Sequence, residues 1–384
     1  MLEALSNDIA TKTMAAPLRI ALIAPLAEAV PPRLYGGTER VVAHLADTLV
    51  ALGQDVTLFA SGDARTKARL VVVREQAIRL DPAKLKSDVA AHLAMLHEVR
   101  LRADEFDVLH FHVDLLHFPL FERVAHRTLT TLHGRQDLAD LAEVYRRWHQ
   151  YPLVSISESQ RKPLRFANWL ATVHHGIPTS LFDLSPSSKG YLAFLGRISP
   201  EKRPDRAIQI ANRTNMPLKI AAKVDVVDAP YHRQVIEPLL KNSTTEFLGE
   251  VRDDGKNELL GGAVALLFPI DWPEPFGLVM IEAMACGTPV ITWDEGAARE
   301  IVDEGITGFV VRSLDEAVDA VRRAAGLDRG AIREQFERRF SAITMSKNYL
   351  RLYSNLTHPA SRFDEHDRRL KRQRSAAAHG AMRA

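Results

Sequence analysis

The sequence predicts an α/β protein with two Rossmann-like, doubly wound parallel-sheet domains that face a cleft. Its 384 residues exceed what one compact core usually holds. Short apolar runs alternate with amphipathic segments along the chain, a pattern typical of parallel sheets covered by helices. A Pro- and Ser-rich stretch over residues 178–189 has no amphipathic period and separates two such series. Sheets of this kind bind ligands at the carboxyl ends of their strands, so we expect the functional site in the cleft.

The first alternating series begins with the nearly continuous apolar run that starts at Leu18, which predicts a buried strand. A Pro- and Gly-rich loop follows. Helices are then predicted over residues 38–52 and 87–103. Further strands are predicted over residues 54–60, 106–112, 127–133, 153–157 and 171–177.

The second series predicts another doubly wound domain. Its strands are expected over residues 191–197, 218–224, 245–251, 265–271 and 288–294. The predicted organisation is an N-terminal extension (1–17), an N-terminal domain (18–180), a C-terminal domain (190–343), a C-terminal helix (344–357) and a basic tail (358–384). We expect the tail to be disordered, because it is charged and poor in apolar residues.

Composition excludes several classes of protein. Hydrophobic residues make up 46% of the chain, which excludes disorder as its main state. The net charge is +2, but residues 358–384 carry seven Lys or Arg and three Asp or Glu, so the remainder is slightly acidic. This distribution argues against a nucleic-acid-binding body.

Cys286 is the only cysteine, which excludes an intrachain disulfide and a cysteine-ligated metal site and fits a reducing compartment. No stretch approaches the roughly 20 apolar residues of a membrane span, and the first residues lack the pattern of a signal peptide. We therefore expect a cytoplasmic protein, with peripheral membrane contact left open.

The densest chemical motif is EPFGLVMIEAMACGTPVI, in which Glu274 and Glu282 stand eight residues apart. Pro275 and Gly277 indicate a loop, and LVMIEAMA a helix. Free N–H groups at such a helix start favour an anionic or polyhydroxyl ligand. Two carboxylates at this separation can accept hydrogen bonds from the hydroxyls of a sugar and a ribose. Spacing alone leaves a surface loop with two solvated glutamates as an equal alternative.

Two further motifs suit phosphate. In FLGRISPEKRPD a predicted strand is followed by Arg197 and Lys202, which can neutralise a diphosphate at the strand's carboxyl end. The alternative is two surface charges with Glu201 as their partner. In RLYGGTERVV, Gly36 and Gly37 precede a helix, where glycines allow close approach of the backbone to a phosphate. Thr38 is the expected N-cap of that helix.

Three histidines end neighbouring predicted strands, namely His110, His112 and His133, so all are expected to point toward the cleft. His110 and His112 share one face of their strand. A metal site formed by these two and Asp114 is conceivable by ligand type. Nothing like H-E-x-x-H is present, so a metal site is disfavoured.

Taken together, these motifs resemble those of retaining GT-B glycosyltransferases, glycosyltransferase family four (glycosyl transferases group 1). The resemblance runs from about residue 18 to about residue 356. It implies an acceptor-side N-terminal domain, a donor-side C-terminal domain, and a nucleotide diphosphate sugar as co-substrate without metal or other cofactor. It implies catalytic roles for Arg197, Lys202, Glu274 and His133, and substrate binding by Gly36, Gly37, Phe276, Gly277, Leu278, Glu282, Glu250 and Val251.

The resemblance further implies that the acceptor hydroxyl attacks from the leaving-group face without a protein nucleophile. UDP-glucose is the default donor, and the acceptor is left open among saccharides, lipid-linked compounds and small molecules. The loop at Lys223 lacks the glycines common in the family, which leaves the binding of the base and ribose in doubt. Alternatives are a nucleotide-sugar epimerase or phosphorylase of the same fold and a non-catalytic binding module. An NAD-dependent dehydrogenase is disfavoured, because no G-x-G-x-x-G follows the first strand.

Overall fold

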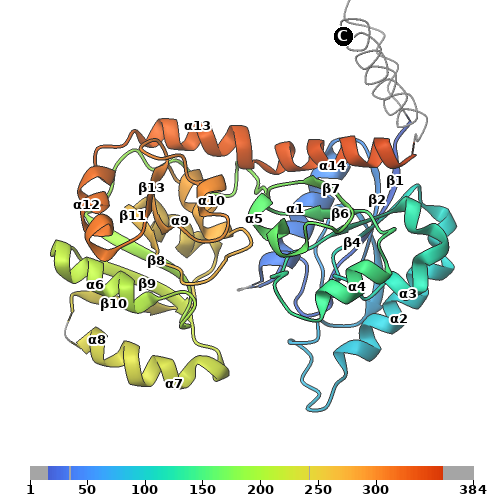
Figure 1. The fold of residues 1–384 in the computed structure, drawn as a ribbon, viewed down its shortest axis with the longest axis horizontal. Coiled ribbons are helices and arrows are strands. Elements are labelled where there is room, and N and C mark those ends of the chain that lie inside the picture. Colours follow the sequence, from blue (N-terminus) through green and yellow to red (C-terminus); the bar gives the residue numbers. More distant parts are fainter. Residues whose placement is uncertain (1–15, 34–35, 242, 358–384) are drawn as a thin grey trace, which may run out of the picture.

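The computed structural model describes residues 16–33, 36–241 and 243–357 and shows two lobes, each built on one parallel sheet (Figure 1). The N-terminal sheet has the strand order β3-β2-β1-β4-β5-β6-β7, and the C-terminal sheet has the order β10-β9-β8-β11-β12-β13. The prediction of two doubly wound parallel-sheet domains is confirmed. Residues 1–15 of the predicted extension and the whole predicted tail, 358–384, lie outside the described residues.

The N-terminal lobe contains the first seven strands and, unexpectedly, the last helix. The strands are β1 (Arg19–Ile23), β2 (Asp55–Ser61), β3 (Arg69–Arg74), β4 (Val108–Phe111), β5 (Thr128–Thr131), β6 (Leu153–Ser155) and β7 (Trp169–Thr172). The helices are α1 (Gly37–Ala51), α2 (Asp88–Leu101), α3 (Phe118–Phe121), α4 (Leu141–Arg147), α5 (Glu158–Arg161) and α14 (Ala342–Thr357), with short turns η1 (Ala103–Glu105), η2 (Glu122–Arg127) and η3 (Lys162–Leu164).

The C-terminal lobe contains the other strands and helices. The strands are β8 (Tyr191–Arg197), β9 (Leu218–Lys223), β10 (Thr245–Gly249), β11 (Ala263–Phe268), β12 (Val290–Trp293) and β13 (Gly308–Val311). The helices are α6 (Pro204–Thr214), α7 (Ala229–Tyr231), α8 (Glu237–Lys241), α9 (Asp253–Gly261), α10 (Leu278–Ala285), α11 (Ala298–Ile301), α12 (Leu314–Ala324) and α13 (Arg329–Phe340), with η4 (Val226–Asp228) and η5 (His232–Ile236). In the described part of the chain, no helix is long and apolar enough to cross a membrane.

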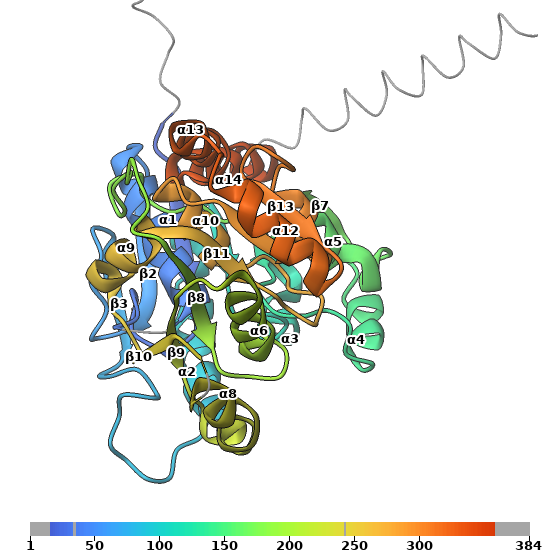
Figure 2. The same ribbon diagram turned by 90° about the vertical axis from the view of Figure 1, so that its left-hand side faces the viewer.

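Both sheets are covered by helices on two faces, which explains their almost continuous apolar strands. In β1, Ile20 and Leu22 belong to the core that contains the α1 and α14 side chains, whereas Ala21 and Ile23 belong to the core beneath α2. Neighbouring residues of a strand point to opposite faces, so all four residues from Ile20 to Ile23 are buried. In the C-terminal lobe, α6 and α12 cover one face of the sheet, and α9, α10 and α13 lie on the other (Figure 2).

The winding direction of each sheet reverses once. In the N-terminal sheet the chain runs outward from β1 to β2 on one side and from β4 to β5 on the other. In the C-terminal sheet the same reversal lies between β8 and β11. Loops after the two strands at a reversal diverge and leave a crevice at their carboxyl ends.

The chain crosses between the lobes twice, and the two crossings are hydrogen-bonded to each other. The first crossing follows β7, and the second lies between α13 and α14, so that α14 packs on the N-terminal lobe (Figure 1). The backbone N–H of Ile177 donates to the Phe340 carbonyl at 3.0 Å, and the N–H of Ala342 donates to the Ile177 carbonyl at 2.9 Å. Gly176 lies so close that a Cβ there would be 2.4 Å from the Ser341 carbonyl oxygen.

Most of the predicted elements are present, with four corrections. Strands β3 and β13 were not predicted, and both lie at the edge of a sheet. The strand predicted over 171–177 is Trp169–Thr172, because the following residues leave the sheet and Ile177 pairs with Ser341 instead. Thr38 is not the N-cap, because α1 already begins at Gly37.

We predict that Gly176→Ala destabilises the protein by about 1–3 kcal/mol, because the added methyl group forces the two crossings apart. Urea unfolding followed by circular dichroism measures the change. The control is Gly326→Ala, where the added Cβ would meet its nearest atom at 3.6 Å. Equal midpoints for the two variants would show that the crossings tolerate separation.

Stability should fall below pH 6.5, because burial lowers the pKa of six histidines below the ordinary value of 6.5. The unfolded chain then binds more protons than the folded one, and each histidine contributes up to about 1.4 kcal/mol of destabilisation per pH unit. Urea midpoints at pH 7, 6 and 5 test this, and His44→Gln should flatten the profile above its own pKa of about 4. A flat parental profile would contradict the prediction. The six are His44, His110, His112, His117, His133 and His175.

Candidate functional site

A cavity of about 350 Å³ lies between the lobes, at the carboxyl ends of both sheets. Its lining includes all twelve residues that the sequence analysis selected, which come from five separate segments of the chain. The structure thus brings the predicted residues together, and their individual roles stay predictions. They are Gly36, Gly37, His133, Arg197, Lys202, Glu250, Val251, Glu274, Phe276, Gly277, Leu278 and Glu282.

The loop after β11 and the start of α10 carry the two glutamates. Helix α10 begins at Leu278, within the predicted range, and Gly277 precedes it with a left-handed φ of 88°. This backbone conformation favours glycine, and a Cβ there would also lie 3.0 Å from the Phe268 ring. Glu282 lies about one turn inside the helix and is 4% exposed. The alternative of two solvated glutamates is therefore wrong for Glu282.

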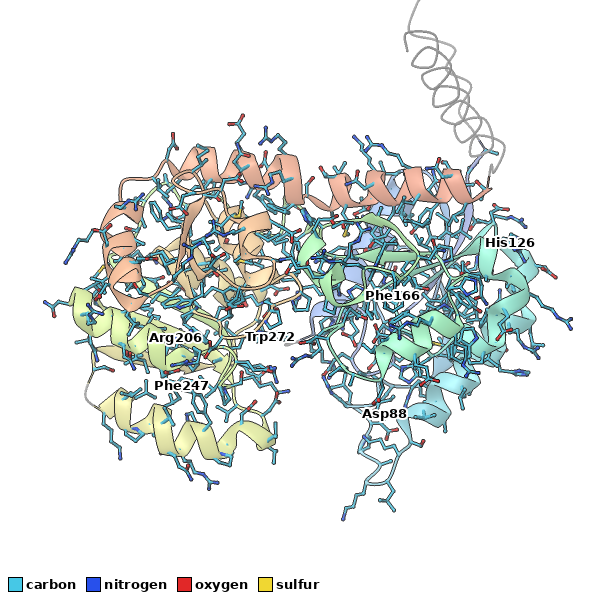
Figure 3. All side chains as sticks on the ribbon, in the orientation of Figure 1. Asp88, His126, Phe166, Arg206, Phe247 and Trp272 are labelled. Atoms are coloured by element: carbon cyan, nitrogen blue, oxygen red, sulfur yellow. The ribbon has the colours of Figure 1, made fainter. Side chains whose placement is uncertain are left out.

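Lys202 contacts Glu274 directly through its Nζ atom, although 72 residues separate them. The ammonium group also lies 5.2 Å from the centre of the Phe268 ring and 5.3 Å from that of Trp272, a cation–π geometry. Lys202 is 8% exposed. It is therefore no ordinary surface charge. Its neighbour Trp272 lies on the side of the C-terminal lobe that faces the other lobe (Figure 3).

Arg197 ends β8 and is surrounded by acidic side chains. Its guanidinium lies 3.6 Å from Asp225, 3.8 Å from Asp228 and 3.8 Å from Glu201. Arg197 thus pairs with Glu201, as the alternative interpretation predicted, and it also lines the cavity. Lys223, another strand end, lies 2.9 Å from Asp225, and this contact holds the pKa of the Asp225 carboxyl below its usual value.

An ionic network that the sequence analysis missed joins the two lobes at the same cavity. Lys256 on α9 lies 3.0 Å from Glu282 and 3.5 Å from Asp253. Asp253 in turn accepts a hydrogen bond of 2.7 Å from Arg40 on α1. Arg40 and Asp253 are 213 residues apart, so no local sequence pattern could have revealed the pair. Both Lys256 and Arg40 line the cavity.

The cavity suits an anionic ligand that also carries hydroxyls. Five basic side chains and three acidic ones line it, and further carboxylates behind the lining pair with the basic groups. His133 and His175 also line it, and burial lowers the pKa of His133 to about 3, so that its ring is neutral at pH 7. A neutral imidazole can hydrogen-bond to a sugar hydroxyl. The basic residues are Arg40, Arg197, Lys202, Lys223 and Lys256, and the acidic ones are Glu250, Glu274 and Glu282.

The three strand-end histidines do not act alike. His133 faces the cleft as expected, but His110 is fully buried. Its ring nitrogens bond to the Tyr353 hydroxyl and the Thr131 hydroxyl, each at 2.8 Å, so His110 attaches α14 to the sheet. The expectation that all three point into the cleft is wrong for His110. In the described part of the chain, no group of three His, Cys, Asp or Glu side chains is arranged to hold a metal ion.

Two family models match the chain side by side. One, described as Glycosyltransferase Family 4, matches residues 35–181, and the other, described as Glycosyl transferases group 1, matches residues 182–338. Phosphatidyl-myo-inositol mannosyltransferase of Mycobacterium leprae is 26% identical over 379 residues, or 90% of this chain and 99% of the relative. D-inositol 3-phosphate glycosyltransferase of Kribbella flavida is 32% identical over 148 residues, 35% of each chain.

Solved structures share the two-lobed fold. Sucrose-phosphate synthase from Thermosynechococcus elongatus superimposes with a TM-score of 0.70 at 20% identity, covering 88% of this chain and 98% of that one. Anabaena HepE, solved in complex with UDP-glucose, gives a TM-score of 0.67 at 18% identity, with 88% and 100% covered. The two adjoining family matches, the named relatives and the shared fold agree, and the chain is therefore a glycosyltransferase of the GT-B fold.

Proposed function

We propose that this protein is a retaining family-four enzyme that moves a hexose from a nucleotide diphosphate sugar to an acceptor hydroxyl. The observation that carries the proposal is the composition of the inter-lobe cavity. Cations at the end of β8 lie beside the two glutamates of the α10 segment, and the start of α1 lies opposite. A diphosphate, a sugar and a ribose each find a suitable partner within this one cavity.

In this proposal the Lys202 ammonium group pairs with Glu274 when no donor is bound and with the diphosphate when the donor is bound. In the structure it contacts Glu274, and a donor diphosphate competes for the same ammonium group. When the diphosphate takes Lys202, the Glu274 carboxylate becomes available to sugar hydroxyls. Arg197 and Lys202 then stabilise the charge that develops on the departing nucleotide, which is commonly a large contribution to catalysis.

The anomeric configuration of the sugar is retained because the acceptor hydroxyl attacks from the same face that the nucleotide leaves. The acceptor oxygen forms a bond to the anomeric carbon while the bond from that carbon to the diphosphate oxygen breaks. The proton of the acceptor hydroxyl passes to the leaving diphosphate. No protein nucleophile and no metal take part, so a trapped glycosyl-enzyme or an inverted product contradicts the proposal.

UDP-glucose is the first donor to assay. HepE, which shares the fold, was solved with UDP and with UDP-glucose. A mannose donor is the second, since the Mycobacterium leprae relative is named a mannosyltransferase. Epimerisation or phosphorolysis of the donor would appear as turnover without an acceptor, or as dependence on inorganic phosphate.

The rate of donor hydrolysis tests the proposed roles of Lys202 and Glu274. We expect Lys202→Met and Glu274→Gln each to lower this rate about 100-fold or more, because each removes a group that stabilises or orients the reacting donor. The controls are Lys189→Met and Glu143→Gln, whose side chains are 63% and 83% exposed away from the cavity. Unchanged hydrolysis in both test variants would overturn their assigned roles.

Nucleotide binding should raise the melting temperature by mass action. We expect one nucleoside diphosphate to give a rise of several degrees at saturation, with the others weaker, and the rise to persist in EDTA because no metal is involved. Differential scanning fluorimetry with UDP, GDP and ADP measures this. Loss of the rise in EDTA would show that a divalent cation takes part in binding.

A further inference from the structure

A second cavity, of about 330 Å³, lies in the N-terminal lobe next to the first. It opens between the loops that follow β1 and β4, at the point where the winding of the N-terminal sheet reverses. Such a crevice is the ordinary ligand position of a doubly wound sheet. The wall between the cavities is shared, because Thr38, His133 and Gly134 line both. A ligand in the second cavity would therefore lie beside a sugar in the first.

Asp114 is the one acidic residue in the described lining of the second cavity. Its φ of 50° is left-handed, a conformation that costs energy for a side-chain-bearing residue and that often marks functional loops. The residue is exposed toward the cavity, while surrounding protein limits the hydration of its carboxyl and raises its pKa to about 6. A backbone hydrogen bond from His133 ties it to the shared wall.

His112 and His133 contribute neutral imidazole rings to the same lining. Their rings are joined by a hydrogen bond of 2.9 Å between Nδ1 of His112 and Nε2 of His133. The other two ring nitrogens are buried and have no hydrogen-bond partner among the described residues. Because each neutral imidazole has one donor and one acceptor, the pair retains one of each, whichever ring donates. Both nitrogens are shielded from the cavity, so the pair contributes an uncharged wall beside Asp114.

The charge of the second cavity contrasts with that of the first. The described residues of its lining include no lysine or arginine, whereas five basic side chains line the donor cavity. Recognition of a phosphate group normally uses arginine, lysine or a helix start. A phosphate placed here would face the Asp114 carboxyl, with the start of α1 at Thr38 but no lysine or arginine of the described lining as its partner. The two inositol-related relatives carry names that denote phosphorylated inositol compounds.

We propose that the second cavity binds the acceptor and selects an uncharged polyhydroxyl compound, with Asp114 accepting hydrogen bonds from its hydroxyls. This inference rests on the proposed glycosyl transfer and names its substrate class. Asp114 orients the acceptor, and the proton of the attacking hydroxyl still leaves with the diphosphate. The other lining residues are Pro25, Thr38, His92, His112, Val113, Leu116, His133 and Gly134.

Paired acceptors test the selected class. Purified full-length protein with its preferred donor is assayed with myo-inositol against D-inositol 3-phosphate, and with glucose against glucose 6-phosphate. Occupancy is scored as transfer or as inhibition of donor hydrolysis, so an imperfect acceptor still gives a signal. We expect each neutral member to act at least tenfold more effectively than its phosphorylated partner. Preference for the phosphorylated members, or no effect of any neutral member while hydrolysis proceeds, overturns the proposal.

Variants locate the binding site. Asp114→Gly removes the carboxyl at a backbone conformation that glycine adopts easily, and Asp114→Asn keeps the shape. We expect kcat/KM for the neutral acceptor to fall tenfold or more with glycine and less with asparagine, mainly through KM. Leu116→Trp, at a position 39% exposed, should fill the cavity and raise KM further. The control is Asp140→Asn, an exposed aspartate outside both cavities.

Nucleotide affinity separates the two proposals. If the parent protein binds no nucleoside diphosphate and hydrolyses no donor, the proposed function fails and the acceptor assignment falls with it. If nucleotide binding is normal in the parent and the variants, but Asp114→Gly and Leu116→Trp transfer to the neutral acceptor as well as Asp140→Asn does, only the acceptor assignment is wrong.

Discussion

The reversal of winding in each parallel sheet is the constraint on which both cavities depend. Parallel strands send all their outgoing loops to one edge, and loops on either side of a reversal move apart. Between β8 and β11 this separation leaves room for Arg197, Lys202 and Glu274. Between β1 and β4 it leaves room for Asp114 and its histidine neighbours. The candidate site residues thus lie beside the winding reversals, where the strand order leaves a gap between loops.

The alignment of the two edges depends on contacts between the lobes. Helix α14 returns to the N-terminal lobe, where the hydroxyls of Tyr349 and Tyr353 bond to Thr131 and His110 inside the core. Glu300 of the C-terminal lobe accepts hydrogen bonds of 2.7 Å from the backbone N–H groups of Glu158 and Ser159. These contacts hold the lobes close on the side of the crossings, and the donor cavity lies between them. A substitution far from the cavity can therefore change its width.

Charge is distributed unequally between the cavities, and this difference assigns the donor to one cavity and the acceptor to the other in the proposed reaction. The donor cavity contains the cations that the proposed reaction assigns to the leaving diphosphate, and Lys202 and Lys256 form ion pairs with Glu274 and Glu282. The neighbouring cavity has neutral imidazoles and one carboxyl. A charged leaving group and a neutral attacking group can thus be bound side by side, because His133 belongs to both walls without adding charge.

Local sequence patterns and the family resemblance were sufficient to predict the two-domain α/β class and to select twelve of the residues that line the donor cavity. Apolar runs mark parallel strands, and short motifs such as EPFGLVMIE place Glu274 and Glu282 at a helix start. The return of α14, the burial of His110, the pairing of Arg40 with Asp253 and the position of Asp114 in a second cavity became evident in the folded protein. These features join residues that are far apart in the chain, and such contacts arise from packing and strand order, which no short stretch of sequence encodes.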